Sequence, residues 1–252
     1  MRRYGLIGNP LTHSFSKNYF SAKFTRENIL DARYDLFSLE TIGLLPGLID
    51  DIQHLCGLNV TIPYKEAILP FLHNLDEIAS TIGAVNTIHV GPNKQLTGYN
   101  TDVYGFRQSI KPFLESHHER ALILGTGGAS KAVAFVLKEI GVECHFVTRH
   151  KNISMVTGQK SNLFTYEEVN EYVIRHFPLI VNTTPVGTYP YTDAAPPIPY
   201  AFLTPRHFLC DLIYNPAETL FLKEARVRGA ITLNGLSMLQ QQAEKAWEIW
   251  NT

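Results

Sequence analysis

Hydrophobic and polar positions follow two alternating patterns along this chain, and together they predict an α/β fold. Short apolar runs typical of strands are separated by stretches with the spacing of a helix. The predicted strands are residues 4–8, 34–39, 56–61, 121–124, 145–148, 179–182 and 208–213. The predicted helices are residues 17–28, 64–72 and 237–250, with one starting near residue 102 and one following residue 129. Residues 185–205 are rich in proline and predict a loop.

The strand–helix series starts twice, which predicts two α/β lobes. The alternation of strands and helices predicts that the strands are mostly parallel. The first lobe takes residues 1–101 plus 237–252, and the second takes residues 102–236. A chain of 252 residues is long enough for two domains. A cleft between two lobes is the default place for a ligand, so we expect the active site there.

Composition and charge narrow the class of protein. Hydrophobic residues make up 45%, charged residues 18%, and the net charge is −1, as in an ordinary globular protein without a basic surface for nucleic acid or an anionic membrane. No apolar run is long enough to span a membrane or act as a signal peptide, so we expect a cytoplasmic protein. Three widely separated cysteines and ten histidines show no metal-ligand spacing, so we expect neither a disulfide nor a metal site.

A glycine-rich turn follows the strand at residues 121–124 and precedes a helical pattern. It reads Gly125-Thr126-Gly127-Gly128-Ala129-Ser130. Glycine allows a tight turn and a close approach of the backbone to a pyrophosphate, whose charge the helix N-terminus then binds. The spacing departs from GxGxxG because Ser130 replaces the third glycine. A tight turn without a ligand is the alternative interpretation, but the strand–turn–helix context favours dinucleotide binding.

The next strand ends in Thr148-Arg149-His150-Lys151, which bears on the choice of cofactor. Enzymes that use NAD place an acidic residue near this position, where it binds the ribose hydroxyls, whereas NADP enzymes place arginine there. No acid is present, and a guanidinium suits a 2′-phosphate. A solvated basic patch would have the same residues, but the position relative to Gly125 favours NADP.

Four polar clusters stand at predicted strand ends in the first lobe. Neutral donors and acceptors of this kind suit a polyhydroxylated ligand. Each cluster alone could cap a helix or satisfy the backbone, so it is their coincidence that favours a binding site. The clusters are residues 13–16, 59–65, 84–87 and 98–102.

These clusters resemble the shikimate dehydrogenase family, and the similarity runs nearly from end to end. The motif Asn59-Val60-Thr61-Ile62-Pro63-Tyr64-Lys65 is highly specific, whereas the glycine turn is not. The other matching motifs are Gly8-Asn9-Pro10, His13-Ser14-x-Ser16, Gly83-Ala84-Val85-Asn86-Thr87, Asn100-Thr101-Asp102, Asn182-x-Thr184-Pro185-x-Gly187, Asp211-x-x-Tyr214-x-Pro216 and Asn234-Gly235-Leu236-x-Met238-Leu239-x-x-Gln242-Ala243.

The resemblance implies a substrate lobe, a Rossmann-like NADP-binding lobe, and reversible reduction of 3-dehydroshikimate to shikimate, a step in the biosynthesis of chorismate and aromatic amino acids. It implies that Lys65 and Asp102 form the catalytic pair and also contact the substrate. The other implied substrate contacts are Ser14, Ser16, Asn59, Thr61, Asn86, Tyr214 and Gln242. The implied contacts to NADP or NADPH are Glu77, Gly125, Thr126, Gly127, Gly128, Ala129, Thr148, Arg149, Lys151, Leu212 and Gly235. The only implied partner is the small-molecule substrate, in a monomer or a homodimer.

The chain departs from the family pattern at several positions. Lys17 stands where proline is usual, and Ser237 where glycine is usual. Thr148-Arg149-His150 replaces an Asn-Arg-Thr stretch, and Lys151 is the candidate substitute for a further arginine. Three alternatives remain: a quinate/shikimate dehydrogenase that prefers NAD, a folate-processing dehydrogenase, and a dinucleotide-binding sensor without catalysis. The cations near residue 149 disfavour an enzyme that prefers NAD. The hydroxyl-rich pocket disfavours a folate-processing enzyme, and the presence of Lys65 and Asp102 disfavours a sensor without catalysis.

Overall fold

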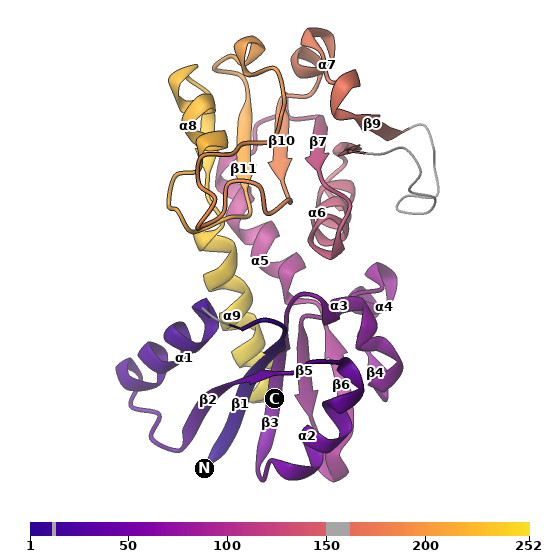
Figure 1. Cartoon of the computed structure of the whole chain (residues 1–252), viewed down its shortest axis with the longest axis vertical. Helices are drawn as coiled ribbons and strands as arrows, with labels where there is room; N and C mark the ends of the chain where they lie inside the picture. The colour runs from indigo at the N-terminus through magenta and orange to yellow at the C-terminus, as the bar shows by residue number, and fades with distance from the viewer. Residues whose placement is uncertain (12–13, 150–161) are drawn as a thin grey trace. The chain divides into compact units, whose positions relative to one another are not determined.

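The computed structural model describes residues 1–11, 14–149 and 162–252, which form two compact α/β units (Figure 1). The first unit comprises Met1–Tyr104 and Gln240–Thr252, and the second comprises Gly105–Leu239. Helix α5 (Thr101–Ile110) and helix α9 (Leu236–Trp250) each begin in one unit and continue into the other. The first unit is therefore built from two separate stretches of the chain.

The first unit contains a six-stranded sheet in the order β2-β1-β3-β5-β6-β4 (Figure 1). Strands β1, β2 and β3 are mutually parallel, whereas β5 runs antiparallel to both β3 and β6. The elements are β1 (Arg2–Gly8), α1 (Phe15–Arg26), β2 (Ala32–Ser38), α2 (Leu45–Asp51), β3 (Leu55–Val60), α3 (Tyr64–Ala67), β4 (Asn74–Leu75), α4 (Glu77–Ile82), β5 (Thr87–Val90) and β6 (Leu96–Tyr99).

Successive residues of β1 face opposite sides of this sheet, as the period of a strand requires. Tyr4 and Leu6 belong to a cluster with Phe20 of α1 and Trp250 of α9. Ile7 belongs to a second cluster, formed with residues of α2, α3 and the neighbouring strands. The aromatic rings of Tyr4 and Trp250 stack with their centroids 4.9 Å apart, which fixes the end of α9 in the first unit.

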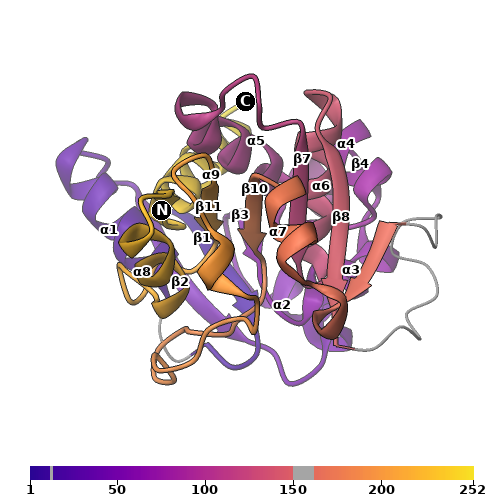
Figure 2. The same cartoon turned by 90° about the horizontal axis from the view of Figure 1, so that it is seen from above.

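The second unit contains a fully parallel sheet in the order β12-β11-β10-β7-β8-β9. Numbered from β7 within this unit, the order is 3-2-1-4-5-6, that of a dinucleotide-binding Rossmann fold. Figure 2 shows β11, β10, β7 and β8 side by side. The elements are β7 (Arg120–Leu124), α6 (Gly128–Glu139), β8 (Glu143–Thr148), β9 (Leu163–Thr165), α7 (Glu171–His176), β10 (Leu179–Asn182), β11 (Phe208–Asp211), α8 (Leu220–Val227) and β12 (Ile231–Leu233).

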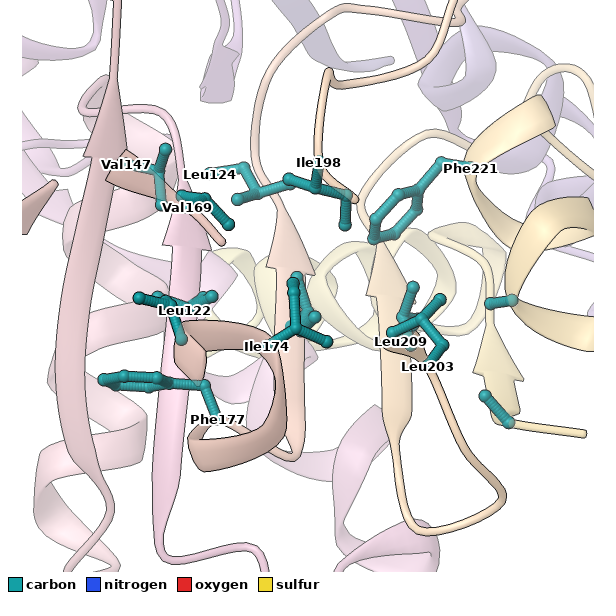
Figure 3. Packing of buried hydrophobic residues seen from close by; sticks show 14 of the residues in the cluster. Leu122, Leu124, Val147, Val169, Ile174, Phe177, Ile198, Leu203, Leu209 and Phe221 are labelled. Carbon is teal, nitrogen blue, oxygen red and sulfur yellow. The ribbon is translucent and has the colours of Figure 1, made fainter. Parts of the chain in front are cut away.

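One face of the second sheet is covered by a buried hydrophobic cluster (Figure 3). Leu122 and Leu124 of β7 pack there with Ile174 of α7 and Phe221 of α8. The intervening residues of β7 face the opposite side, where α6 contacts β7 and β8. This packing holds the carboxyl ends of β7, β10 and β11 in one row.

The structure corrects several predicted elements. The predicted helix 64–72 is too long, because Pro70 provides no backbone N–H and the chain continues from α3 as a short 3₁₀ helix, Leu69–Phe71. The predicted strand 208–213 ends at Asp211, whose carboxylate accepts a hydrogen bond from the backbone N–H of Ile213. The antiparallel strands β5 and β6 were not predicted, because His89 interrupts the apolar residues of β5, and Thr97 and Gly98 interrupt those of β6.

Within the described ranges, no helix has the length and apolar character needed to cross a membrane. All three cysteines are free; Cys144 and Cys210 are buried, whereas Cys56 is only partly buried.

Candidate active site

The side chains of Lys65 and Asp102 meet in the first unit. Lys65 lies in the first turn of α3, which begins just after Pro63, and Asp102 lies in the first turn of α5. The Lys65 Nζ donates a hydrogen bond to Asp102 Oδ2 at 2.6 Å, and the two side chains are 20% and 10% exposed. A carboxylate is favourable at a helix N-terminus, and the largely dry surroundings strengthen its attraction to the ammonium.

Asn86 holds this pair in place from a segment between the two helices. Its backbone N–H donates to Tyr99 O at 3.0 Å, while the N–H of Val85 donates to Lys65 O at 2.8 Å. The Asn86 Oδ1 accepts from the backbone N–H of Thr101 at 2.7 Å, so its Nδ2 must face the other way. That nitrogen donates to Asp102 Oδ1 at 2.9 Å. Both carboxylate oxygens of Asp102 therefore have partners.

Gln242 of α9 joins the same network. Its Oε1 accepts hydrogen bonds from Asn86 Nδ2 and from Thr101 Oγ1, each at 3.3 Å. Among the residues that the structure describes, none accepts a hydrogen bond from the Gln242 amide nitrogen, and Lys65 Nζ has no acceptor besides Asp102. These two groups thus keep donors for a ligand.

The network continues away from Lys65 through buried hydroxyl and amide groups. Asn59 Nδ2 donates to Thr87 Oγ1 at 3.2 Å, and Asn59 Oδ1 accepts from the Tyr34 hydroxyl at 2.7 Å. Burial raises the pKa of Tyr34, and a hydrogen bond with the Ser16 side chain opposes that shift. The structure thus brings six predicted substrate residues into one hydrogen-bonded network: Ser16, Asn59, Lys65, Asn86, Asp102 and Gln242.

Three other predicted substrate residues lie elsewhere. Ser14 caps α1, its hydroxyl accepting from the Lys17 N–H at 3.2 Å. Thr61 follows β3 and packs so closely on Gly8 that a Cβ there would lie 2.4 Å from the Thr61 methyl carbon. Tyr214 belongs to the second unit, in the segment after β11. The network itself contains residues absent from the predicted set: Tyr34 in a strand, and Thr87 and Thr101, which adjoin predicted positions.

The glycine-rich turn has the geometry that a dinucleotide requires. Gly125 directly follows β7 with φ +102°, a conformation that other residues rarely adopt, and a Cβ there would lie 2.9 Å from Thr183 Oγ1. Gly127 differs: its φ is −80°, and a Cβ would meet no atom within 4 Å. Nothing in the fold requires glycine at 127, whereas a pyrophosphate at the N-terminus of α6 needs that space. Thr126, Gly128 and Ala129 complete the turn, so these residues fit the group.

The remaining predicted cofactor residues lie at three places. Thr148 is the buried last residue of β8 and Arg149 follows it, exposed. Burial raises the pKa of Tyr166 and the nearby positive charge of Arg149 opposes it, so these two side chains are close. Glu77 is the exposed first residue of α4 in the first unit. Lys151 lies outside the described residues.

Leu212 and Gly235, predicted for the nicotinamide side, are in direct contact. The Gly235 N–H donates to Ile213 O at 3.0 Å. A Cβ on Gly235 would lie 2.1 Å from Leu212 O, so the approach of the two backbones excludes any side chain. Among the described residues, no group of three or more His, Cys, Asp or Glu side chains could hold a metal ion.

The second unit is a Rossmann fold with an open glycine turn, and the first unit carries a paired lysine and carboxylate; together they define a nicotinamide-dependent oxidoreductase. Comparison with known proteins names the family. Residues 6–88 match the family model described as the shikimate dehydrogenase substrate binding domain. The shikimate dehydrogenase (NADP(+)) of Caldanaerobacter subterraneus is 38% identical over 98% of this chain and 90% of its own. The chain belongs to the shikimate dehydrogenase family.

Two solved structures are also similar. Shikimate 5-dehydrogenase from Thermus thermophilus, in complex with NADP(H) and shikimate, has a TM-score of 0.86 and 32% identity over 99% of this chain and 93% of its own. Quinate dehydrogenase from Corynebacterium glutamicum, in complex with NAD, has a TM-score of 0.85 and 29% identity over the same shares of the two chains. The predicted family and fold class are confirmed.

Proposed function

We propose that this protein catalyses the NADP-dependent, reversible reduction of 3-dehydroshikimate to shikimate. The observation that carries the proposal is the Lys65–Asp102 pair at one end of a buried network of amides and hydroxyls. The names of the similar enzymes support the same reaction.

The network residues would hold the ring of the substrate. Gln242 and Lys65 offer N–H donors and Ser16 a hydroxyl group, all suited to ring hydroxyls and a carboxylate. Asn59 already donates to Asn86 O and Thr87 Oγ1, so it would offer only the remaining acceptor capacity of its Oδ1. Ser14, Thr61 and Tyr214 would complete the set. Because the amide of Asn86 is fixed by the Thr101 N–H and by Asp102, the pocket is ordered before substrate arrives.

Lys65 would move the proton. Reduction of the ketone adds a hydride to carbon and a proton to oxygen, and bound NADPH supplies the hydride. Lys65 would donate the proton to the developing alkoxide and accept it again in the reverse reaction. Asp102 would hold the Lys65 ammonium and receive a hydrogen bond from the substrate hydroxyl.

The second unit would bind the cofactor. The backbone of Gly125, Thr126, Gly127, Gly128 and Ala129 would bind the pyrophosphate at the N-terminus of α6. Thr148, Arg149 and Lys151 would bind the 2′-phosphate, Leu212 and Gly235 would line the nicotinamide, and Glu77 would lie near the cofactor. A quinate/shikimate dehydrogenase that prefers NAD is the second candidate, because quinate dehydrogenase in complex with NAD is a structural neighbour.

One assay tests both candidates. Purified protein is given shikimate or quinate, each with NADP⁺ or NAD⁺, and reduced nicotinamide is followed by its absorbance. We expect the highest kcat/KM for shikimate with NADP⁺. Higher values for quinate or for NAD⁺ would favour the second candidate, and turnover of neither substrate would refute the proposed reaction.

A further inference from the structure

A carboxylate outside the proposed catalytic pair is buried at the carboxyl end of β11. Asp211 is fully buried, and both of its oxygens accept hydrogen bonds. Its Oδ1 accepts from Asn182 Nδ2 and from the Ile213 N–H, each at 3.0 Å. Its Oδ2 accepts from Thr219 Oγ1 at 2.6 Å. All three donors are neutral.

The charge of Asp211 is only partly compensated. Throughout the described ranges, no basic side chain forms an ion pair with it, and its recorded hydrogen bonds all come from neutral groups. Thr219 caps α8, so the N-terminus of that helix contributes a partial positive charge. A buried carboxylate without a cation is costly, and burial raises the pKa of Asp211 to about 6. Above that pH the carboxyl is mainly ionised, and a negative charge remains inside the unit.

Asp211 stands where ligands bind in sheets of this type. It pairs in register with Asn182 of β10, which pairs in turn with Leu124, the residue before the glycine turn. These three residues end neighbouring parallel strands, and the carboxyl edge of such a sheet carries the dinucleotide site. The next residue is Leu212, which contacts Gly235.

We propose that Asp211 is the counter-charge of the oxidised nicotinamide, so that it strengthens the binding of NADP⁺ relative to NADPH. The proposal rests on the proposed function, because it assumes that Leu212 and Gly235 line the nicotinamide. The oxidised ring carries one positive charge that the reduced ring lacks, and the two cofactors are otherwise nearly identical. A fixed negative charge in a low-dielectric interior therefore acts on one form and hardly on the other. Asp211 would act at a distance, without touching the reacting atoms.

The test is the dissociation constant of each cofactor form, measured by titration calorimetry without substrate. Asp211→Asn removes the charge and keeps the shape of the side chain. We expect the ratio of Kd for NADP⁺ to Kd for NADPH to rise about fivefold to tenfold, the effect of one unit charge about 12–17 Å away in protein of effective dielectric constant near 20. The Kd for NADPH should change by less than about twofold on the same argument.

Thr219→Val, measured at about pH 8 or above, is the matched control, because it removes a hydrogen bond that lowers the pKa of Asp211 but leaves the carboxyl in place and ionised at that pH. Thr219→Val should change the Kd for NADP⁺ and the Kd for NADPH by the same factor. The proposal would be overturned if Asp211→Asn weakened the binding of NADP⁺ and NADPH equally, or changed neither Kd. It would also be overturned if Thr219→Val changed the ratio of the two Kd values as much as Asp211→Asn does. If the unmodified protein binds neither cofactor, the proposed function itself fails.

If Asp211→Asn does not fold, the ratio is measured on the unmodified protein between about pH 5 and about pH 8, the range that brackets the shifted carboxyl. The neighbouring titratable groups are Cys210 and Tyr200, whose pKa values burial raises above this range. The cofactor phosphates are common to both forms and cancel in the ratio. Preference for NADP⁺ should weaken as the pH falls below about 6. A constant ratio would overturn the proposal.

Discussion

The Lys65 ammonium lies 2.6 Å from a carboxylate oxygen of Asp102, although 37 positions separate the two residues in sequence. If this pair moves the proton, Lys65→Ala should lower kcat about 10²–10⁴-fold, the usual contribution of general acid–base catalysis. The KM for shikimate should change far less, because the amide and hydroxyl network remains. Lys65→Arg should not restore activity, since a guanidinium stays protonated.

Lys94 provides the control for Lys65. Its Nζ lies 2.7 Å from Asp50 Oδ1, but the Lys94 side chain is 51% exposed. Lys94→Ala should leave kcat unchanged, as surface ion pairs contribute little. Steady-state kinetics on folded variants decide the question: near-normal kcat in Lys65→Ala would remove Lys65 from the mechanism.

Ser14 and Thr61 should contribute to substrate binding. Each alanine variant should raise the KM for shikimate about twofold to tenfold, the effect of one neutral hydrogen bond, without changing the KM for NADP⁺. Because Ser14 also caps α1, Ser14→Ala should in addition lower the stability by about 0.5–2 kcal/mol. Ser14→Asn, which can still cap the helix, separates the two effects in a thermal unfolding measurement. Unchanged KM values in both alanine variants would contradict these assignments.

The two glycines of the turn should respond differently to alanine. Gly125→Ala should destabilise the protein by about 1–3 kcal/mol, because φ is +102° and the new Cβ would clash with Thr183 Oγ1. Gly127→Ala should leave the melting temperature nearly unchanged, because a Cβ meets no atom there. The same substitution should weaken the binding of both NADP⁺ and NADPH. Calorimetric binding and thermal unfolding of both variants test this contrast. Normal cofactor binding by Gly127→Ala would argue against a pyrophosphate at this turn.

Arg149 should determine the preference for NADP. Arg149→Ala should raise the KM for NADP⁺ about tenfold or more, the loss of charge-assisted hydrogen bonds, and leave the KM for NAD⁺ nearly unchanged. Arg175 of α7, an exposed arginine paired with Glu171, is the control and should affect neither cofactor when changed to alanine. Equal kcat/KM for NADP⁺ and NAD⁺ in the unmodified protein would contradict the prediction.

Asp211 should make stability depend on pH. Because burial raises its pKa from the ordinary 3.8 to about 6, the native state binds more protons than the unfolded state between these values. The free energy of unfolding should therefore fall as the pH rises through this window, by about 3 kcal/mol at most from this group. Asp211→Asn lacks this titration, so its stability relative to the unmodified protein should improve from about pH 4 to about pH 7. Chemical denaturation of both proteins across this pH range measures the difference.

In the second unit the sequence predicted β7, α6, β8, β10 and β11, but not β9, α7, α8 or β12. Strands β7 and β10 are continuous apolar runs bounded by polar or glycine residues, and parallel strands buried on both faces have that pattern. The first sheet mixes parallel and antiparallel pairs, and β4 has only two residues, too few to leave a periodic signal. Local patterns therefore found most of its long elements and missed the edge that carries β4, β5 and β6.

The candidate site shows the same limit. Ser16, Asn59, Asn86 and Asp102 were identified as polar residues at strand ends, but no local pattern indicates that Gln242 of α9 reaches them. Tyr34 lies in a predicted strand, where its ring counts as part of the apolar pattern, so the sequence did not indicate that its hydroxyl donates a hydrogen bond to Asn59. Resemblance to a family indicated Gln242, whereas only the three-dimensional arrangement showed Tyr34.

The discontinuity of the first unit has a consequence for the order of folding during synthesis. Its core includes Trp250, whose indole donates to Ile88 O at 3.0 Å and whose ring fills the space beside Gly57, where a Cβ would lie 2.1 Å from Trp250 Nε1. The second unit is one continuous stretch, Gly105–Leu239, and all of it is translated before Trp250. Domains generally fold as units while the chain emerges from the ribosome. Here the unit that is translated first can close its core only after the other has been fully synthesised, so the nascent chain must carry an open first unit until the last turns of α9 appear.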